Sequence, residues 1–438
     1  MNKEIKYKLL TYGCQMNDYD SEVISSLVES TGAYPVEKPE DADIIIFNTC
    51  CVRESADNKV YGRLGQYKIL KKENPNLLIV VAGCLAEKDG EKMIKKFPQV
   101  DLVVGPRNAY RIVSLIEQAK KKKIVCLNQD DAVFLNPLSR SGNITGYIPV
   151  SVGCDCFCTY CIVPYVRGRL KSRPAGEIVA EAERLVKQGF GEIFLLGQNV
   201  NSYGFDLPGK PTFAELLEKI NGIDGIRRIR FVSPHPKDFH PDLIKAVGKL
   251  ENVCKSVHLP MQSGSNRILK LMNRKYDREQ YLKIIHGLRK EVPEIALSTD
   301  IIVGFPGETN EDFEETLDIV RDVQFDLAFM FAYSPRDGTA AAKIPDQVPH
   351  DEKMNHLYRL IEMQNDISRA KNEKFVGQVL ECLVESLSKK DPTKLTGRTE
   401  RNRVVNFTGD KSLIGEFVNV KLTSAFTWGW IGEMAEGG

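Results

Sequence analysis

The sequence has no long hydrophobic run and no secretory leader, and both absences narrow the classes of protein to consider. Across its 438 residues no apolar stretch reaches the length that spans a bilayer. The start, MNKEIKYKLL, has neither the apolar core nor the small-residue cleavage site of a signal peptide. We therefore expect a cytoplasmic protein without a membrane partner. Thiols stay reduced there, so clustered cysteines are expected to bind metal or do chemistry instead of forming disulfides.

A strong net charge is also missing. Sixty basic and 59 acidic residues leave a formal charge of +1, so affinity for nucleic acid must come from local basic patches. The glycine-rich turn GFPGET, residues 304–309, has no Lys-Ser/Thr pair after it, which excludes a P-loop. The length is too great for one ordinary core and predicts two to four domains.

Cysteine, in contrast, is concentrated in residues 151–173, where four of the eleven cysteines fall within eight positions. Cys154, Cys158 and Cys161 have the spacing C-x3-C-x2-C, which lets three thiolates from one loop converge on a soft metal centre. Three thiolates leave one iron of a 4Fe-4S cluster open to a small molecule, whereas a structural zinc site needs a fourth Cys or His nearby. We favour the cluster over an incomplete zinc knuckle. The basic residues that follow indicate an anionic partner.

The first part of the chain, residues 1–125, alternates strand and helix patterns. Continuous apolar strands such as IIIF and LLIVV indicate a parallel sheet covered on both faces, hence a doubly wound α/β domain. Cys14, Cys50 and Cys84 stand at the ends of its first three strands, where parallel strands share one crevice. They form a second candidate metal site, although each alone could be a buried core cysteine. Cys51, Cys126, Cys254 and Cys382 are interpreted as bystanders.

A polar, irregular segment, residues 121–146, is predicted to be a linker. In the central domain, residues 140–372, six strand patterns separated by amphipathic helices predict a parallel (β/α)6 barrel or part of one. Polar residues gather at the carboxyl ends of its strands, the face on which such barrels carry their sites, and about half are expected to be structural caps instead. The candidates for cofactor contacts are Gln198, Ser233, Gln262, Asp300 and Arg336.

The last part, residues 373–438, follows a charged amphipathic helix over 347–375 and shows short alternating strands. This pattern predicts a small all-β barrel of about five strands. Arg398, Arg401 and Arg403 stand on or near one turn. Small barrels of this kind often bind single-stranded nucleic acid, but a charged, solvated loop explains the same residues equally well.

The C-x3-C-x2-C loop after the first barrel strand, with Tyr160 just before its last cysteine, resembles the radical S-adenosylmethionine (SAM) superfamily. Three more cysteines in a preceding α/β domain, together with a small β-barrel tail of the TRAM kind, narrow the resemblance to the methylthiotransferases. Within them the chain is similar to the tRNA-modifying MiaB type in TYGCQMNDYDSE, NTCCVRESA, AGCLAE, PYVRGRLKSRP, LLGQNVNSYG and GRTERNRVVNF.

The resemblance implies two 4Fe-4S clusters. Cys154, Cys158 and Cys161 would hold the cluster that binds SAM, with Tyr160 at the cofactor. Cys14, Cys50 and Cys84 would hold an auxiliary cluster that carries the sulfur. One SAM would supply a methyl group and another a 5′-deoxyadenosyl radical, which breaks an unactivated C–H bond. The family usually has a polar or basic residue in place of Cys156 and a small one in place of Cys51, and only Cys158 preserves the spacing with its neighbours.

The implied product is a 2-methylthio group on N6-isopentenyl(dimethylallyl)adenosine beside the anticodon of tRNA. An anticodon loop is easily splayed out for capture by basic loops and a β-barrel. We predict phosphate contacts from Arg167, Arg169, Arg173, Arg398, Arg401 and Arg403. A low-potential electron donor such as flavodoxin or ferredoxin and a monomeric state are also expected.

Three alternative functions stay open. Two belong to the same family, namely methylthiolation of N6-threonylcarbamoyladenosine in tRNA and of an aspartate in a ribosomal protein. The third is a non-catalytic iron-sulfur module that binds RNA or senses redox state, which would leave the SAM-type loop unexplained.

Overall fold

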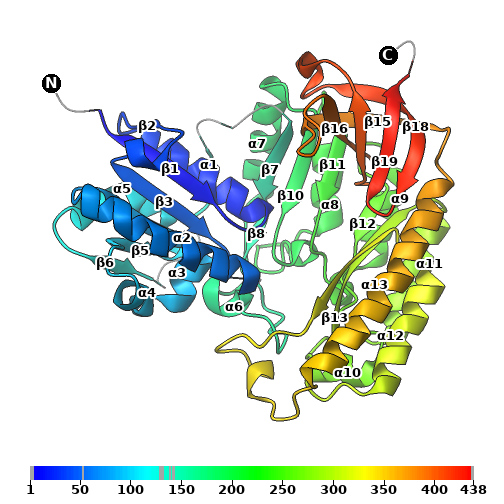
Figure 1. Ribbon diagram of the computed structural model, residues 1–438. Coiled ribbons are helices and arrows are strands. Elements are labelled where there is room, and N and C mark those ends of the chain that lie inside the picture. Colours follow the sequence, from blue (N-terminus) through cyan, green and yellow to red (C-terminus); the bar gives the residue numbers. More distant parts are fainter. Residues whose placement is uncertain (1–3, 52–53, 128–132, 138–139, 141–143, 436–438) are drawn as a thin grey trace. The chain divides into compact units, whose positions relative to one another are not determined.

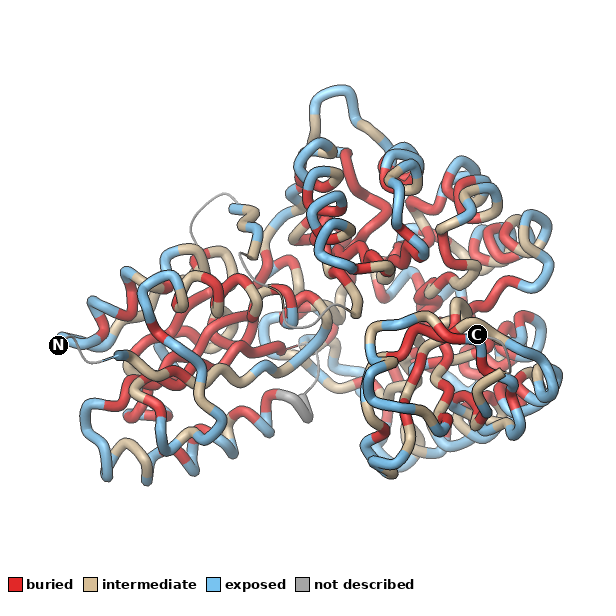
Figure 2. Tube along the Cα trace, turned by 90° about the horizontal axis from the view of Figure 1, so that it is seen from above, coloured by how far each residue is buried: buried red, intermediate tan, exposed pale blue. Residues whose placement is uncertain are grey.

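The structure is a computed structural model that describes residues 4–51, 54–127, 133–137, 140 and 144–435. The chain divides into two compact units, each with its own hydrophobic core. The first comprises Met1–Ser141, Val152–Asp155 and Cys161–Arg173, and the second comprises Gly142–Ser151, Cys156–Tyr160 and Pro174–Gly438. Buried residues gather in the interior of each unit, and exposed residues lie on its outer segments (Figure 2). In the described part of the chain, no helix is both long and apolar enough to cross a membrane.

The first unit is built on a six-stranded parallel sheet of order β2-β1-β3-β4-β5-β6 (Figure 1). Its strands are β1 (Lys6–Thr11), β2 (Tyr34–Pro35), β3 (Ile44–Thr49), β4 (Leu78–Gly83), β5 (Leu102–Val104) and β6 (Ile124–Cys126). The predicted linker over 121–146 therefore begins too early, because β6 completes the sheet inside it. Part of that linker, residues 128–132, 138–139 and 141–143, lies outside the described residues.

Helices cover both faces of this sheet. Alternate residues of β3 point to opposite sides, so Ile44 and Ile46 join one core and Ile45 and Phe47 the other. The first core is closed by α1 (Gln15–Glu29) and α5 (Ile112–Ala119), and the second by α2 (Glu54–Glu73), α3 (Cys84–Asp89) and α4 (Glu91–Lys96). The doubly wound α/β prediction is confirmed. The short helices α3 and α4, and the 3-10 helices η1 (Pro39–Asp41) and η2 (Pro106–Arg111), were not predicted.

The second unit begins with a parallel array of six strands, as predicted. They are β7 (Thr145–Pro149), β10 (Glu192–Leu196), β11 (Arg228–Phe231), β12 (Ser256–His258), β13 (Ala296–Val303) and β14 (Leu327–Ala332). The strands form two three-stranded sheets, and a parallel bridge between Ile229 and Val253 links the segment before β12 to β11. Helices follow the strands and bury their apolar faces in one core, namely α7 (Ala175–Lys187), α8 (Phe213–Asn221), α9 (Pro241–Lys249), α11 (Arg278–Glu291) and α12 (Asn310–Val323). This is the partial barrel that the sequence predicts.

The second unit ends in a closed barrel of five strands, which confirms the prediction for the tail. A long helix, α13 (His350–Glu373), leads into it. The strands are β15 (Val379–Leu387), β16 (Lys394–Thr399), β17 (Val404–Thr408), β18 (Phe417–Phe426) and β19 (Gly429–Met434). Most pairs are antiparallel, and the parallel pair β17–β19 closes the ring.

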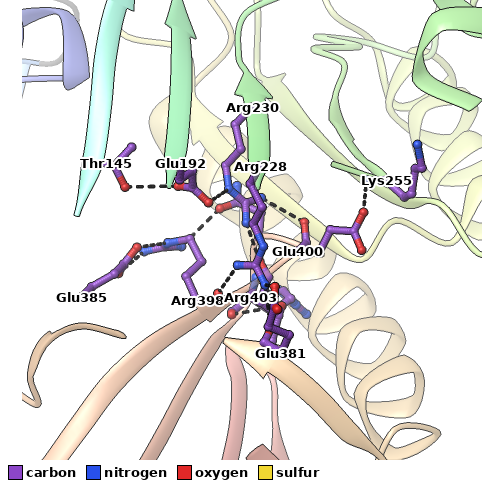
Figure 3. A network of polar contacts seen from close by, with 12 residues as sticks. Thr145, Glu192, Arg228, Arg230, Lys255, Glu381, Glu385, Arg398, Glu400 and Arg403 are labelled. Atoms are coloured by element: carbon purple, nitrogen blue, oxygen red, sulfur yellow. Dashed lines mark hydrogen bonds and ion pairs between the residues drawn. The ribbon is translucent and has the colours of Figure 1, made fainter. Parts of the chain in front are cut away.

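Two buried arginines attach this closed barrel to the parallel strands (Figure 3). Arg230 pairs with Glu192 at 2.8 Å and donates to the carbonyl oxygens of Glu400 and Thr399. Arg228 donates to the carbonyl oxygens of Arg398 and Glu381. Because Glu192 and Arg228 begin β10 and β11, the closed barrel sits at the amino-terminal ends of these strands. The carboxyl ends of β10 and β11, which Gln198 and Ser233 follow, lie at the opposite edge of the parallel strands.

Candidate active site

The first unit places Cys50 and Cys84 directly after the neighbouring strands β3 and β4, and Cys14 in the turn that follows β1. Adjacent strands are about 4.8 Å apart, so the three cysteines follow one edge of the sheet. Two glycines allow the backbone before Cys14 and Cys84 to lie close to the end of β3. A Cβ on Gly13 would lie 2.5 Å from Cβ of Cys50, and a Cβ on Gly83 would lie 2.4 Å from the carbonyl oxygen of Thr49. Each glycine therefore lets its following cysteine draw near the end of β3.

Two buried asparagines fix this edge, and sequence reasoning missed both. Asn17 on α1 donates to the carbonyl oxygen of Thr49 at 3.0 Å and accepts from the Cys14 thiol at 3.5 Å. Asn48 on β3 donates to the carbonyl oxygen of Asn17 at 2.8 Å. Both belong to the quoted segments TYGCQMN and NTCC, so their spacing to the cysteines was the available signal.

A guanidinium lies against the third cysteine. Nε of Arg167 donates to Sγ of Cys84 at 3.2 Å, and its Nη2 pairs with Asp20 at 2.7 Å. The Cys51 thiol, followed by the charge of Arg167, lowers the pKa of Cys84 below the usual thiol value. The pKa of Cys51 is raised, first by its hydrogen bond to Cys84 and then by burial. The interpretation of Cys51 as a bystander stays a prediction.

The donor set of this edge fits an iron-sulfur cluster. All eleven cysteines are free thiols, so none of the three is lost to a disulfide. A hydrogen bond with Cys50 lowers the pKa of Cys14, and one with Cys51 lowers that of Cys84. Within the described residues, no three His, Cys, Asp or Glu side chains form a group recognisable as a metal site. The assignment of the ligands therefore rests on sequence and on strand topology.

The loop cysteines are divided between the units. Cys154 and Cys161 belong to the first unit, where the backbone N–H of Cys154 donates to the carbonyl oxygen of Gly168 at 3.1 Å. Cys161 precedes α6 (Val163–Val166), and Val166 is buried in the core with α2 and α3. The segment after the loop is thereby packed on the first unit. The short strands β8 (Ser151–Val152) and β9 (Lys171–Ser172) pair beside it.

Cys156, Cys158 and Tyr160 belong to the second unit, where an arginine that sequence reasoning missed contacts the last two. Nη1 of the buried Arg274 lies 3.3 Å from Sγ of Cys158 and 3.5 Å from the hydroxyl of Tyr160. Cys156 instead accepts from Nδ2 of Asn199 at 3.3 Å. The charged donor is thus on Cys158, the predicted ligand, and a neutral amide is on Cys156, the predicted bystander.

Four of the five polar candidates follow the carboxyl ends of the parallel strands, whereas Asp300 lies inside β13, because that strand continues to Val303. Ser233 follows β11 at φ 61° and Gln262 follows β12 at φ 69°, both in the left-handed region that non-glycine residues rarely adopt. Such backbone strain gathers at functional sites. Asp300 on β13 lies 3.4 Å from Nε2 of His258 and is partly exposed. Gln198 and Arg336 follow β10 and β14 and are partly buried.

The six arginines predicted to contact RNA have different surroundings. Arg169 is exposed, with its side chain 71% accessible, and pairs with Asp155. Arg398 binds Glu385 through two nitrogens, and Arg401 pairs with Asp326. The other three are buried, namely Arg167, Arg173 and Arg403. Their guanidinium groups donate within the chain, to Cys84 and Asp20, to Asn136, and to Asn372 and Thr427 respectively.

Three family models match the chain. Residues 6–105 match uncharacterized protein family UPF0004, residues 148–320 the radical SAM superfamily and residues 373–428 the TRAM domain. A Moorella thermoacetica protein named tRNA-2-methylthio-N(6)-dimethylallyladenosine synthase is 51% identical over 98% of both chains. Proteins of the same name from Clostridium botulinum strain Langeland and Clostridium perfringens strain 13 are 51% and 47% identical, over 97% and 100% of this chain and 95% and 99% of theirs. This chain belongs to their family.

Two solved structures share much of this fold. The methyltransferase TsrM from Kitasatospora setae superposes with a TM-score of 0.59 at 13% identity, over 78% of this chain and 75% of that one. The cobalamin-dependent SAM radical enzyme OxsB superposes with a TM-score of 0.52 at 14% identity, over 83% and 56%. At these identities the likeness shows the fold alone.

Proposed function

We propose that this protein adds a methylthio group to C2 of N6-dimethylallyladenosine beside the anticodon of tRNA. The observation that carries the proposal is the 51% identity, over 98% of the chain, to a protein named for this product. The radical SAM and TRAM models match two parts that such an enzyme needs, one for radical generation and one for RNA binding. The protein is therefore a transferase that uses SAM and 4Fe-4S clusters.

The residues divide into two ligand sets. Cys154, Cys158 and Cys161 hold the cluster that binds SAM, and Cys14, Cys50 and Cys84 hold the auxiliary cluster. When bound, these groups supply the methyl group and the radical chemistry that an unactivated C–H bond requires. The chain itself orients the cofactor and excludes water. In the second unit, the proposed SAM contacts are Tyr160, the residues after strand ends Gln198, Ser233, Gln262 and Arg336, and Asp300 on β13.

RNA contacts are proposed first for the exposed candidate, Arg169. Arg398 and Arg401 would have to exchange their carboxylate partners for phosphate, and the buried arginines would have to leave their pockets. Trp428, 61% exposed after β18, offers a face on which a base can stack. We also propose a low-potential donor such as flavodoxin or ferredoxin, a monomeric enzyme, and a cytoplasmic location where tRNA is found.

The test is product analysis with purified components. Protein reconstituted without oxygen is given SAM, dithionite and an anticodon stem-loop that carries N6-dimethylallyladenosine. We expect 2-methylthio-N6-dimethylallyladenosine and 5′-deoxyadenosine by mass spectrometry of the nucleosides. A stem-loop with N6-threonylcarbamoyladenosine is run in parallel, and product from that RNA alone would overturn the proposed substrate. Absence of 5′-deoxyadenosine with either RNA would contradict radical chemistry.

The neighbouring cysteines provide matched controls. Cys158→Ala should abolish 5′-deoxyadenosine, whereas Cys156→Ala, two positions away, should retain it. Cys50→Ala should lose the iron of one cluster, whereas Cys51→Ala should keep the iron of both. If the control and test variants behave alike, the ligand assignment is wrong even where the product is correct.

A further inference from the structure

The first unit contains a buried charged side chain that the proposed chemistry does not assign. Arg167 is 6% exposed, and both ends of its guanidinium are engaged. Nε donates to Sγ of Cys84 at 3.2 Å and Nη2 pairs with Oδ2 of Asp20 at 2.7 Å. Its sequence context, a basic run after the cysteine loop, indicated a phosphate contact. Its position in the structure indicates a sulfur contact instead.

The backbone around Arg167 is held as firmly as its side chain. Val166, the residue before it, is buried in the core between α2 and α3. Arg107 at η2 donates from Nε to the carbonyl oxygen of Arg167 at 2.9 Å and from Nη2 to that of Arg169 at 2.8 Å. A side chain anchored on both sides in this way loses little entropy when it donates a hydrogen bond.

Charge balance explains why an arginine suits this place. A thiolate taken out of water is costly unless a cation or hydrogen-bond donors compensate for it. Arg167 supplies both to Cys84, since its charged Nε–H donates directly to the sulfur. Arginine stays protonated even when buried, and its planar fork can serve a sulfur and a carboxylate together, which a lysine ammonium does with less definite geometry.

We propose that Arg167 is a positioning residue of the auxiliary cluster, donating to the Cys84 thiolate and stabilising the reduced form of the cluster by its charge. Asp20 orients the guanidinium. The inference rests on the proposed function, since it requires a cluster on Cys14, Cys50 and Cys84. The segment after Cys161, which follows the cysteine loop in sequence, would thereby contribute a residue to the auxiliary site.

The test isolates the auxiliary cluster in the full-length chain. Cys154, Cys158 and Cys161 are replaced by Ala, the protein is reconstituted without oxygen, and the remaining cluster is measured by iron content and by redox titration followed with electron paramagnetic resonance. Arg167→Met, Arg167→Lys and the control Lys171→Met are made in this parent. Lys171 is an exposed basic residue of the same segment.

We expect Arg167→Met to disfavour the reduced cluster about tenfold, equal to about 59 mV for a one-electron couple, because it loses a charged hydrogen bond. Arg167→Lys should shift the potential in the same direction by less, and Lys171→Met should leave it unchanged. A role in folding alone would alter iron content or circular dichroism without moving the potential of the cluster that remains.

The outcomes separate the two hypotheses. If the parent binds no cluster, the two-cluster function fails and this inference fails with it. If the parent binds a cluster whose potential is the same in both Arg167 variants, the inference is overturned and the proposed function stands. If Arg167→Met does not fold, the potential of Arg167→Lys against that of Lys171→Met decides the question.

Discussion

Arg230→Met should detach the closed barrel from the parallel strands more strongly than any change at an exposed ion pair. Arg230 and Glu192 have side chains only 3% and 2% exposed, and the guanidinium also serves the carbonyl oxygens of Thr399 and Glu400 (Figure 3). Methionine leaves a buried carboxylate and two carbonyl groups without this donor. Breaking a buried pair in this way costs about 3 to 5 kcal/mol.

The neighbouring residue is a matched control. Arg227 also reaches the closed barrel, where it pairs with Glu381 and stacks on Phe417 at 4.0 Å, but its side chain is 50% exposed. Exposed pairs and exposed cation–π contacts are each worth about 1 kcal/mol or less, so Arg227→Met should cost no more than about 2 kcal/mol. The two substitutions differ in burial and share the same interface.

The assay follows from the position of the tryptophans. The chain has two, Trp428 and Trp430, and both belong to the closed barrel. Their fluorescence during urea unfolding therefore reports this barrel, and urea leaves ion pairs unscreened. If Arg230→Met costs no more than Arg227→Met, the reasoning is refuted. The double variant Arg230→Met with Glu192→Gln should recover about 1 kcal/mol or more, since no buried charge is then unpaired.

Three further predictions concern the cysteine sites and acid stability. Arg274→Met, in a chain whose Cys14, Cys50 and Cys84 are Ala, should lower the iron retained by the SAM-binding cluster during gel filtration, whereas the exposed neighbour change Lys275→Met should not. Gly83→Ala should abolish iron binding at the auxiliary cluster, because the new Cβ would lie 2.4 Å from the carbonyl oxygen of Thr49. The control Gly65→Ala has open space around it on α2, so it should keep the iron and stabilise the helix by about 0.5 to 1 kcal/mol. Burial would raise the pKa of Asp326, but Lys371 and Arg401 outweigh it and lower the pKa. The ionised Asp326 thus contributes to folding stability above its unfolded pKa near 4, and this stability is lost as pH falls through the lower folded pKa. Asp326→Asn should therefore have a lower melting temperature at pH 7 than the parent and a smaller further decrease between pH 5 and pH 3.

The sequence predicts the layers of this fold well because their signals are local and repeated. IIIF and LLIVV became the central strands β3 and β4 of a sheet covered on both faces. β6 was missed because IVC is too short for a period to be read, and a polar segment follows it. Helices α3 and α4 are also short, and only Gly90 separates them, so neither is long enough to repeat the helical period.

The burial and the partners of individual arginines could not be predicted from such local signals. A run of basic residues looks alike whether its members face solvent or a buried partner, and in this chain Arg169 is exposed while Arg167 is buried. The partners Asp20 and Cys84 lie far from Arg167 in sequence, so only the tertiary structure brings them together. The contact of Arg274 with Cys158 could not be predicted either, because Arg274 lies in a loop that shows no helix or strand periodicity.

Each of the two cysteine sets has one buried guanidinium on one of its thiols, Arg167 on Cys84 and Arg274 on Cys158. The two arginines come from unrelated segments, so the similarity reflects a shared physical requirement. Thiolate sites are anionic, and an overall charge of +1 gives the chain no general field with which to stabilise them. Compensation must therefore be local, and arginine provides it with a charge that burial does not remove. Lysine is therefore expected to be a poor substitute at both positions, because the ammonium keeps the charge but lacks the planar set of donors that binds two acceptors at once.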